Sequence, residues 1–359
     1  MQIIQDYRIL HTIPEPDNRL TKTTAFIRSR LQMLRCRVFS PTAGSVCAYF
    51  DFQKSKTLAF RADTDGLLLQ EQTGLPWKSR HSGMMHACGH DGHTAILLEL
   101  ARRIHRMETL PHNILLIFQP AEETTGGAEA LCKTNLLQEY RVQSVFALHL
   151  WPNLPAGHIF SRPGYLMSRT RNVSVIFTGK SVHIAAGKPG ADALRAACGF
   201  YCSTGNIQES SPHLLKFGVL RGGTASNAIC GEAVLQGSLR TFQDRCDRRL
   251  TASLTMLCSR WAQKTGCIGK VHFSPGYPPV NNCPQLLRKI QKIHPVRILD
   301  RAFMTGEDFS FYQQQVPGVY FLLGIGDTPP LHSPLFSFDE KVLTAGADFF
   351  TAIAEECMP

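Results

Sequence analysis

The sequence predicts an α/β fold in which an α/β/α domain with a mostly parallel sheet carries an inserted ferredoxin-like (βαββαβ) domain. First, apolar strand-like runs alternate with helical patterns up to about residue 170. Second, from residue 171 the order becomes strand, helix, strand, strand, helix, strand. Third, the α/β pattern returns after residue 276. We therefore expect one domain at 1–170 and 277–359, and a second domain at 171–276.

The elements of the first domain follow from the spacing of its apolar residues. Residues 1–35 have a helical period that is interrupted at 10–16. Short β-prone runs at 46–50 and 56–60 precede longer apolar runs at 113–118 and 142–148, which are typical of strands buried on both faces. Helical patterns occupy 93–106 and 126–138, and later a helix at 283–293, a strand at 319–324 and a helix at 340–356.

The inserted domain is expected to contain four strands and two helices. The strands lie at 172–178, 214–220, 234–242 and 268–273, and the helices lie at 190–208 and 244–265.

Composition limits the classes of function. The 359 residues include 43% hydrophobic and 18% charged residues, so a large core is available and disorder is not expected. The formal net charge is +10, but no long run of basic residues accompanies it, so a nucleic-acid partner is not indicated. A positive field that attracts small anionic substrates fits better.

The cysteines indicate the compartment. Twelve of them are scattered without a C-x-x-C pair, which argues against a zinc ribbon or a thioredoxin motif. The N-terminus lacks the pattern of a signal peptide, and no apolar stretch approaches the ~18 residues of a membrane span. We therefore expect a cytoplasmic protein with free thiols and no membrane partner.

Chemically capable side chains follow three of the predicted strands. Asp63 and Asp65 follow the strand at 56–60, Glu122 and Glu123 follow the next, and His149 ends the third. Because the carboxyl ends of parallel strands meet at one edge of a sheet, we expect a site there.

The densest group of metal-ligating side chains lies between His86 and His93 and includes Cys88 and His90. Glycines and a helical pattern place this group on a turn that opens onto a helix. Thiolate and imidazole donors suit zinc and neighbouring divalent ions. The alternative is a polar loop in which hydrogen bonds satisfy these side chains.

Five residues together form a candidate ligand set: Cys88, His90, Glu123, His149 and His332. One ion normally takes three or four protein ligands, so five suit two ions that share a bridging group. Asp63 and Asp65 are then expected to orient imidazoles, although both fit equally well as ordinary turn residues.

Adjacent carboxylates are costly unless a cation lies beside them. If strand geometry continues, Glu122 and Glu123 point to opposite sides, so that Glu123 binds metal and Glu122 faces a water molecule. Glu122 would take the proton of that water and pass it to a leaving amine. Two solvated loop residues are the alternative.

A series of motifs in chain order resembles the M20 metallopeptidase family, in particular the branch of aminoacylases, hippurate hydrolases and N-acetyl-diaminopimelate deacetylases. The motifs lie at 61–67, 85–95, 119–123, 149–152, 222–227, 238–242, 306–309 and 331–334. They span nearly the whole chain, and the Met-His-Ala-Cys-Gly-His-Asp stretch is highly specific.

The resemblance implies an amidohydrolase with two metal ions, zinc or manganese, with nickel or cobalt as alternatives, that cleaves N-acetyl or N-aroyl amino acids. A dipeptidase or carboxypeptidase of the same fold is the alternative. Glu122 would be the general base, and His183 on a dimerising lid domain would polarise the scissile carbonyl, often in the partner's site. Asn227 and Arg240 would hold the substrate carboxylate.

Three positions depart from the family pattern: Gly187-Lys188 replaces Pro-His, and Leu68 and Cys230 replace prolines. These changes concern the lid and the rim, so they bear on the substrate rather than the reaction. Two further classes are a hydrolase with Cys88 as nucleophile, which leaves three candidate ligands without a purpose, and a non-catalytic binding protein. The latter would be expected to lose Glu122 or a ligand, and none is lost.

Overall fold

The computed structural model describes residues 1–186 and 190–356, and the chain divides into two compact units. Unit 1 contains Met1–Leu166, Val280–Ala302 and the chain from Asp308 onward, whereas unit 2 contains Met167–Pro279 and Phe303–Glu307. Unit 1 has a mixed, mostly parallel sheet and unit 2 an antiparallel sheet, so the predicted fold class is confirmed. Residues Gly187 and Lys188, where the motif departs from the family, lie outside the described ranges.

Unit 1 is built on a sheet in the order β1-β2-β4-β3-β5-β14-β6-β13. Its strands are β1 Arg37–Phe39, β2 Val46–Phe50, β3 Thr57–Asp63, β4 Asn113–Gln119, β5 Val142–Trp151, β6 Ile159–Ser161, β13 Val296–Ile298 and β14 Gly318–Gly324. The central strands β4, β3, β5 and β14 are parallel to one another, and every residue of β3, β4 and β14 is buried. Such strands require cover on both faces.

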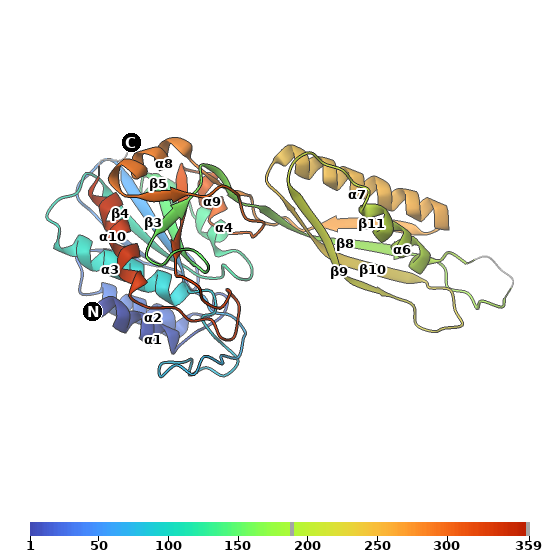
Figure 1. Cartoon of the computed structure of the whole chain (residues 1–359), viewed down its shortest axis with the longest axis horizontal. Coiled ribbons are helices and arrows are strands. Elements are labelled where there is room, and N and C mark those ends of the chain that lie inside the picture. The colour runs from blue at the N-terminus through green and yellow to red at the C-terminus, as the bar shows by residue number, and fades with distance from the viewer. Residues whose placement is uncertain (187–189, 357–359) are drawn as a thin grey trace. The chain divides into compact units, whose positions relative to one another are not determined.

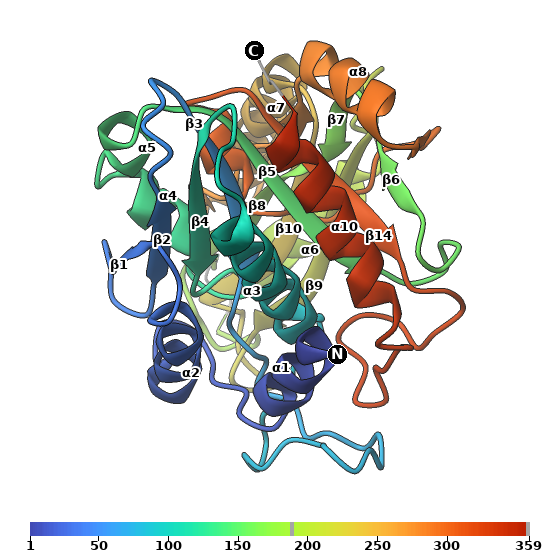
Figure 2. The same ribbon diagram turned by 90° about the vertical axis from the view of Figure 1, so that its left-hand side faces the viewer.

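Helices supply that cover: α1 Gln2–His11, α2 Thr21–Leu31, α3 His90–Arg106, α4 Gly127–Cys132, α5 Leu136–Glu139, α8 Pro284–Ile293, α9 Ser310–Gln313 and α10 Val342–Glu355. Figure 2 shows α3 and α10 side by side over the central strands, with α1 against α3. The predicted helix at 126–138 is in fact two short helices, because Asn135 adopts a left-handed conformation with φ 61°. Helix α3 begins at His90, three residues earlier than predicted.

The parallel register brings the chemically capable residues to one edge of this sheet. Asp63 at the end of β3 lies opposite Gln119 at the end of β4, and Arg61 lies opposite Ala147 on β5. His149 follows two residues after Ala147. The segments that carry the carboxylates and His149 therefore leave the sheet at the same edge.

Unit 2 contains β8 Arg169–Thr178, α6 Ala193–Thr204, β9 His213–Gly222, β10 Glu232–Thr241, α7 Asp244–Thr265 and β11 Ile268–Phe273. The sheet order β11-β8-β10-β9 is antiparallel throughout, as in a ferredoxin-like unit. Figure 1 shows α6 and α7 on one face of the sheet. Buried apolar side chains such as Val175, Phe177 and Leu250 fill that side, whereas the other face carries both polar and apolar side chains.

Two short strands, β7 Gly164–Met167 and β12 Val280–Asn282, pair in a separate small sheet. Among the described residues, no helix is both long and apolar enough to span a bilayer.

Candidate metal centre and active site

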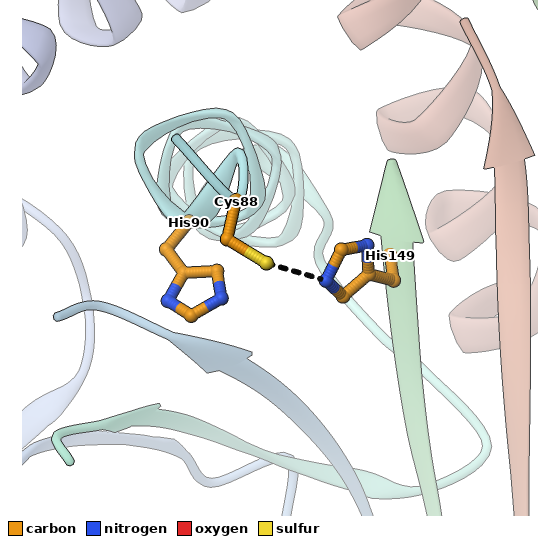
Figure 3. Close-up of side chains that lie close together, drawn as sticks. All are labelled: Cys88, His90 and His149. Atoms are coloured by element: carbon orange, nitrogen blue, oxygen red, sulfur yellow. Dashed lines mark hydrogen bonds between the residues drawn. The ribbon is translucent and has the colours of Figure 1, made fainter. Parts of the chain in front are cut away.

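The turn before α3 presents Cys88 and His90 to the end of β5. Gly89 between them has φ 85°, a left-handed conformation that favours glycine, and it is the residue directly before helix α3. Sγ of Cys88 lies 3.4 Å from Nε2 of His149. Figure 3 shows the three side chains converging from the turn and from β5.

His149 is held in the tautomer that a metal ligand requires. Its Nδ1 donates to the backbone oxygen of Leu150 at 2.7 Å, so the lone pair is on Nε2, the atom that faces Cys88. Burial lowers the pKa of His149 well below its usual range. The imidazole is therefore neutral, as coordination requires.

Within the described chain, Nε2 of His90 and Oε1 of Glu123 are buried polar atoms without a hydrogen bond of regular geometry, although Oε1 of Glu123 lies in ion-pair range of His332. Nδ1 of His90 donates to the backbone oxygen of Asp65 at 2.9 Å, which leaves Nε2 as an acceptor. This Nε2 and Oε1 of Glu123 lie 3.8 Å apart. Because such atoms cost free energy when unsatisfied, a bound cation between them explains their burial.

The electrostatics also favour a cation. Burial lowers the pKa of His90, but the carboxylates of Asp63, Asp65 and Glu123 outweigh burial and raise it to about 10. The excess of negative charge that would hold a proton on this imidazole would equally hold a metal ion in the proton's place.

The candidate ligands form two groups that share one residue. Ligand atoms of Cys88, His90 and His149 lie within 4.8 Å of one another, and so do those of Cys88, Glu123 and His332. Nε2 of His332 is 3.1 Å from Oε1 of Glu123. Cys88 belongs to both groups, so this donor set of thiolate, imidazole and carboxylate fits two divalent ions with a shared ligand.

The expectation that Glu122 and Glu123 point to opposite sides is wrong. Their carboxylates lie together with His90 in a third group within 4.8 Å. The reason is that β4 ends at Gln119 and Ala121 turns the chain through a left-handed conformation with φ 60°. A non-glycine residue in this conformation is strained, which is common at functional sites.

Asp65 fixes the segment that carries the two glutamates. Its carboxylate accepts from the backbone N–H groups of Glu122 and Glu123, each at 3.1 Å, and Oδ1 lies 3.4 Å from Nδ1 of His90. Asp63 instead accepts from Nδ1 of His93 at 2.5 Å. Both carboxylates therefore contact an imidazole, and their effect on metal binding stays a prediction.

A buried ion network that the sequence reading missed lies beneath the site. Arg61 donates to Asp63 at 2.7 Å, to Asp308 at 2.8 Å and to Gln119 at 2.9 Å. Burial raises the pKa of Asp63, but the neighbouring His90, the charge of Arg61 and a hydrogen bond from His93 outweigh burial and hold it well below its usual range. The sequence does carry one signal for this network, namely Arg61 inside an apolar strand, because a buried charge must be paired.

A second missed network ties α1 to the ligand turn. Nδ1 of His11 lies 2.6 Å from Asp91 and its Nε2 lies 3.2 Å from Glu71. Burial lowers the pKa of His11, but hydrogen bonds to the two carboxylates raise it to about 9. Because Asp91 follows the candidate ligand His90 directly, the network helps to fix the ligand turn.

The electrostatics of Cys88 disfavour its use as a nucleophile. Burial and the neighbouring carboxylates of Glu123 and Glu122 raise the pKa of the thiol well above its usual range. A nucleophilic cysteine needs the opposite shift, whereas a bound cation would itself stabilise the thiolate.

The three remaining predicted residues belong to unit 2. Nε2 of His183 lies 3.5 Å from Nδ2 of Asn227, and the backbones of the two segments are bonded, so these residues lie together. Arg240 lies near the opposite end of β10. At ~3.4 Å per residue, the strand alone places Arg240 roughly 25 Å or more from Asn227.

The chain is similar to known proteins over nearly its whole length. The model of the peptidase family M20/M25/M40 matches residues 59–356. N-acetyldiaminopimelate deacetylases of Streptococcus uberis and Exiguobacterium sibiricum are 35% and 34% identical, covering 99% and 95% of both this chain and the respective relative.

A solved Bacillus subtilis structure, described as a dinuclear metal binding peptidase from the M20 family, is 28% identical over 98% of this chain and 96% of its own, with a TM-score of 0.87. The chain therefore belongs to peptidase family M20/M25/M40 and is a hydrolase of amide bonds.

Proposed function

We propose that this protein hydrolyses the amide bond of N-acyl amino acids, with acetyl or aroyl acyl groups, to a carboxylate and a free amino acid. The observation that carries the proposal is the pair of ligand groups that share Cys88, with Glu122 beside them. The deacetylase relatives support an N-acyl amino acid rather than a peptide as substrate.

Two divalent ions held by Cys88, His90, Glu123, His149 and His332 would supply Lewis-acid polarisation of the scissile carbonyl and of a water molecule. Zinc or manganese suits these ligands. Glu122 would accept the proton of the attacking water and deliver it to the leaving amine. Asp65, which binds the backbone of both glutamates, would keep the Glu122 carboxylate in place for both transfers.

We also propose that the working unit is a homodimer. Asn227 and Arg240 lie too far apart in one chain to hold the same carboxylate, so a site that uses both needs Asn227 and His183 from one subunit and Arg240 from the other. Closed two-fold pairing is the commonest oligomer, and β9 offers an edge for it. The described cysteines are free thiols, which supports a cytoplasmic location.

The test is release of free amine from a panel of N-acetyl and N-benzoyl amino acids, with dipeptides as comparison and each metal restored to apo-protein. Glu122→Gln should lower kcat by roughly 10²–10⁴-fold with unchanged metal content. The matched control is Glu129→Gln, because the carboxylate of Glu129 is exposed and pairs with Lys133. This variant should keep full activity. Faster cleavage of dipeptides than of every N-acyl amino acid would refute the proposal.

A further inference from the structure

A long segment between β3 and the ligand turn carries a buried carboxylate. Residues 67–85 form this segment, a strap whose ends are joined by two backbone hydrogen bonds between Leu67 and Met85, at 2.8 and 3.0 Å. The structure describes the whole strap, and only Glu71 and Met85 in it are buried. A carboxylate that is buried in an otherwise exposed loop is costly unless donors surround it.

Three donors surround the carboxylate of Glu71. Its Oε2 accepts from the backbone N–H of Ser79 at 2.6 Å, and the hydroxyl of Thr73 donates to its Oε1, so the carboxylate folds the strap on itself. Nε2 of His11 lies 3.2 Å from the same Oε1. Burial raises the pKa of Glu71, but the hydrogen bonds of His11 and Thr73 outweigh burial and lower it. Glu71 therefore anchors the strap on α1 as a charged group.

The strap also holds the loop that carries one candidate ligand. The backbone N–H of Gln72 donates to the backbone oxygen of Pro334 at 2.8 Å. On the other side of this loop, the backbone N–H of His332 donates to the backbone oxygen of Ala87 at 2.8 Å. The segment 331–334 is therefore bonded both to the strap and to the ligand turn.

The two ligand groups differ in how their members are held. Both contain Cys88; the inner group adds His90 and His149, and the outer group adds Glu123 and His332. The inner ligands are all buried, whereas the side chain of His332 is 53% exposed. His332 also adopts a left-handed conformation with φ 64°, and a non-glycine residue keeps such a conformation only where its surroundings impose it. Hydrogen bonds to its loop must therefore do more of the positioning at His332.

We propose that the strap is a positioning element for the ion of the outer group. Gln72 holds the loop of His332, and Glu71 keeps Gln72 in place by anchoring the strap on His11. This inference rests on the two ions of the proposed function, and it assigns a role to residues that are not candidate ligands. Loss of either contact should weaken the binding of the outer ion and leave the affinity of the inner group unchanged.

The experiment titrates zinc into the metal-free full chain in competition with a chromogenic chelator, which gives a dissociation constant for each ion. Gln72→Pro removes the N–H that binds Pro334 and should weaken one ion about tenfold, the lower end of the roughly 10–100-fold effect of partners of metal ligands. Leu68→Pro is the matched control, because Leu68 is exposed in the same strap and its N–H makes no hydrogen bond within the described chain. Both of its constants should stay within twofold of wild type.

Further variants separate positioning from general damage. Glu71→Ala should weaken the same ion, and Glu71→Gln, which keeps an acceptor oxygen, should weaken it less. If Gln72→Pro does not fold, these two variants take its place. In protein that carries His332→Ala, Gln72→Pro should cause no further loss of affinity, because the strap acts through His332.

Three results would overturn the inference while the two-ion site stands: equal constants for Gln72→Pro and Leu68→Pro, equal weakening of both ions, or an undiminished effect of Gln72→Pro without His332. If wild type binds fewer than two ions, the metal pair of the proposed function fails. The strap is then judged by amide hydrogen exchange of residues 329–336 in the metal-free chain. Faster exchange in Gln72→Pro than in Leu68→Pro would support the positioning role, and equal exchange would refute it.

Discussion

Replacement of Arg61 by methionine should destabilise unit 1 strongly. The Arg61 side chain is 1% exposed and binds the carboxylates of Asp63 and Asp308, which are 1% and 0% exposed. Methionine fills a similar volume but leaves both carboxylates buried without their cation. Breaking a buried pair in this way costs about 3–5 kcal/mol, which is a large part of the ~5–15 kcal/mol that stabilises a typical protein.

Amide hydrogen exchange in peptides from β3 and β4, measured across a urea series, reports the free energy of unfolding of unit 1 alone. This choice matters because two units need not unfold together. Arg103→Met is the matched control, since Arg103 is 25% exposed and binds Asp348 and Glu99 at the surface. Its loss should cost only about 0.2–1 kcal/mol.

Combining Arg61→Met with Asp308→Asn should restore part of the lost stability, because the second change removes one of the two uncompensated charges. The two effects should therefore deviate from additivity by about 1 kcal/mol or more. If Arg61→Met costs no more than Arg103→Met, the carboxylates are not held by Arg61, and the reasoning from burial is wrong.

Three further outcomes follow from the site. Chelation should abolish activity, and metal analysis of wild type should give about two ions per chain. Glu123→Gln should lower the metal occupancy, whereas Glu122→Gln should not. The folded pKa of His11, about 9 against 6.5, means that protonated His11 stabilises the fold below pH 6.5 and that this stabilisation is lost as pH rises through 9. The difference in unfolding free energy between wild type and His11→Asn should thus shrink by up to about 3 kcal/mol between pH 6 and 10. Mixing inactive Glu122→Gln with inactive His183→Ala should regenerate hybrid dimers with one intact site. No recovery despite proven subunit exchange would mean that His183 serves its own subunit's site or is structural.

The sequence carried enough information for the fold because apolar runs and helical periods are local signals. The helix at 244–265 and the strand at 268–273 were predicted with the bounds that the structure has. Candidate ligands could also be named, because Cys88 and His90 lie close together in sequence and strand ends share one edge.

The remaining features depend on contacts or conformations that have no local signal. Asp308 is 247 positions from Arg61, so nothing in either segment identifies its partner. The convergence of Glu122 and Glu123 depends on the left-handed conformation of Ala121, which alanine adopts rarely. Likewise, the distance between Asn227 and Arg240 follows from the length and pairing of β10, which the sequence alone does not give.

The position of β14 between β5 and β6 has a consequence for biosynthesis. Until the ribosome has produced β14, β5 lacks its neighbour and presents an unpaired edge of apolar residues. At ~5–20 residues per second, the intervening chain takes roughly 10–35 s to emerge, and β8 to β11 can fold on their own core during that time. His332 emerges later still. During that time the incomplete sheet exposes an edge that can aggregate. The metal site lacks its last candidate ligand until translation is nearly complete.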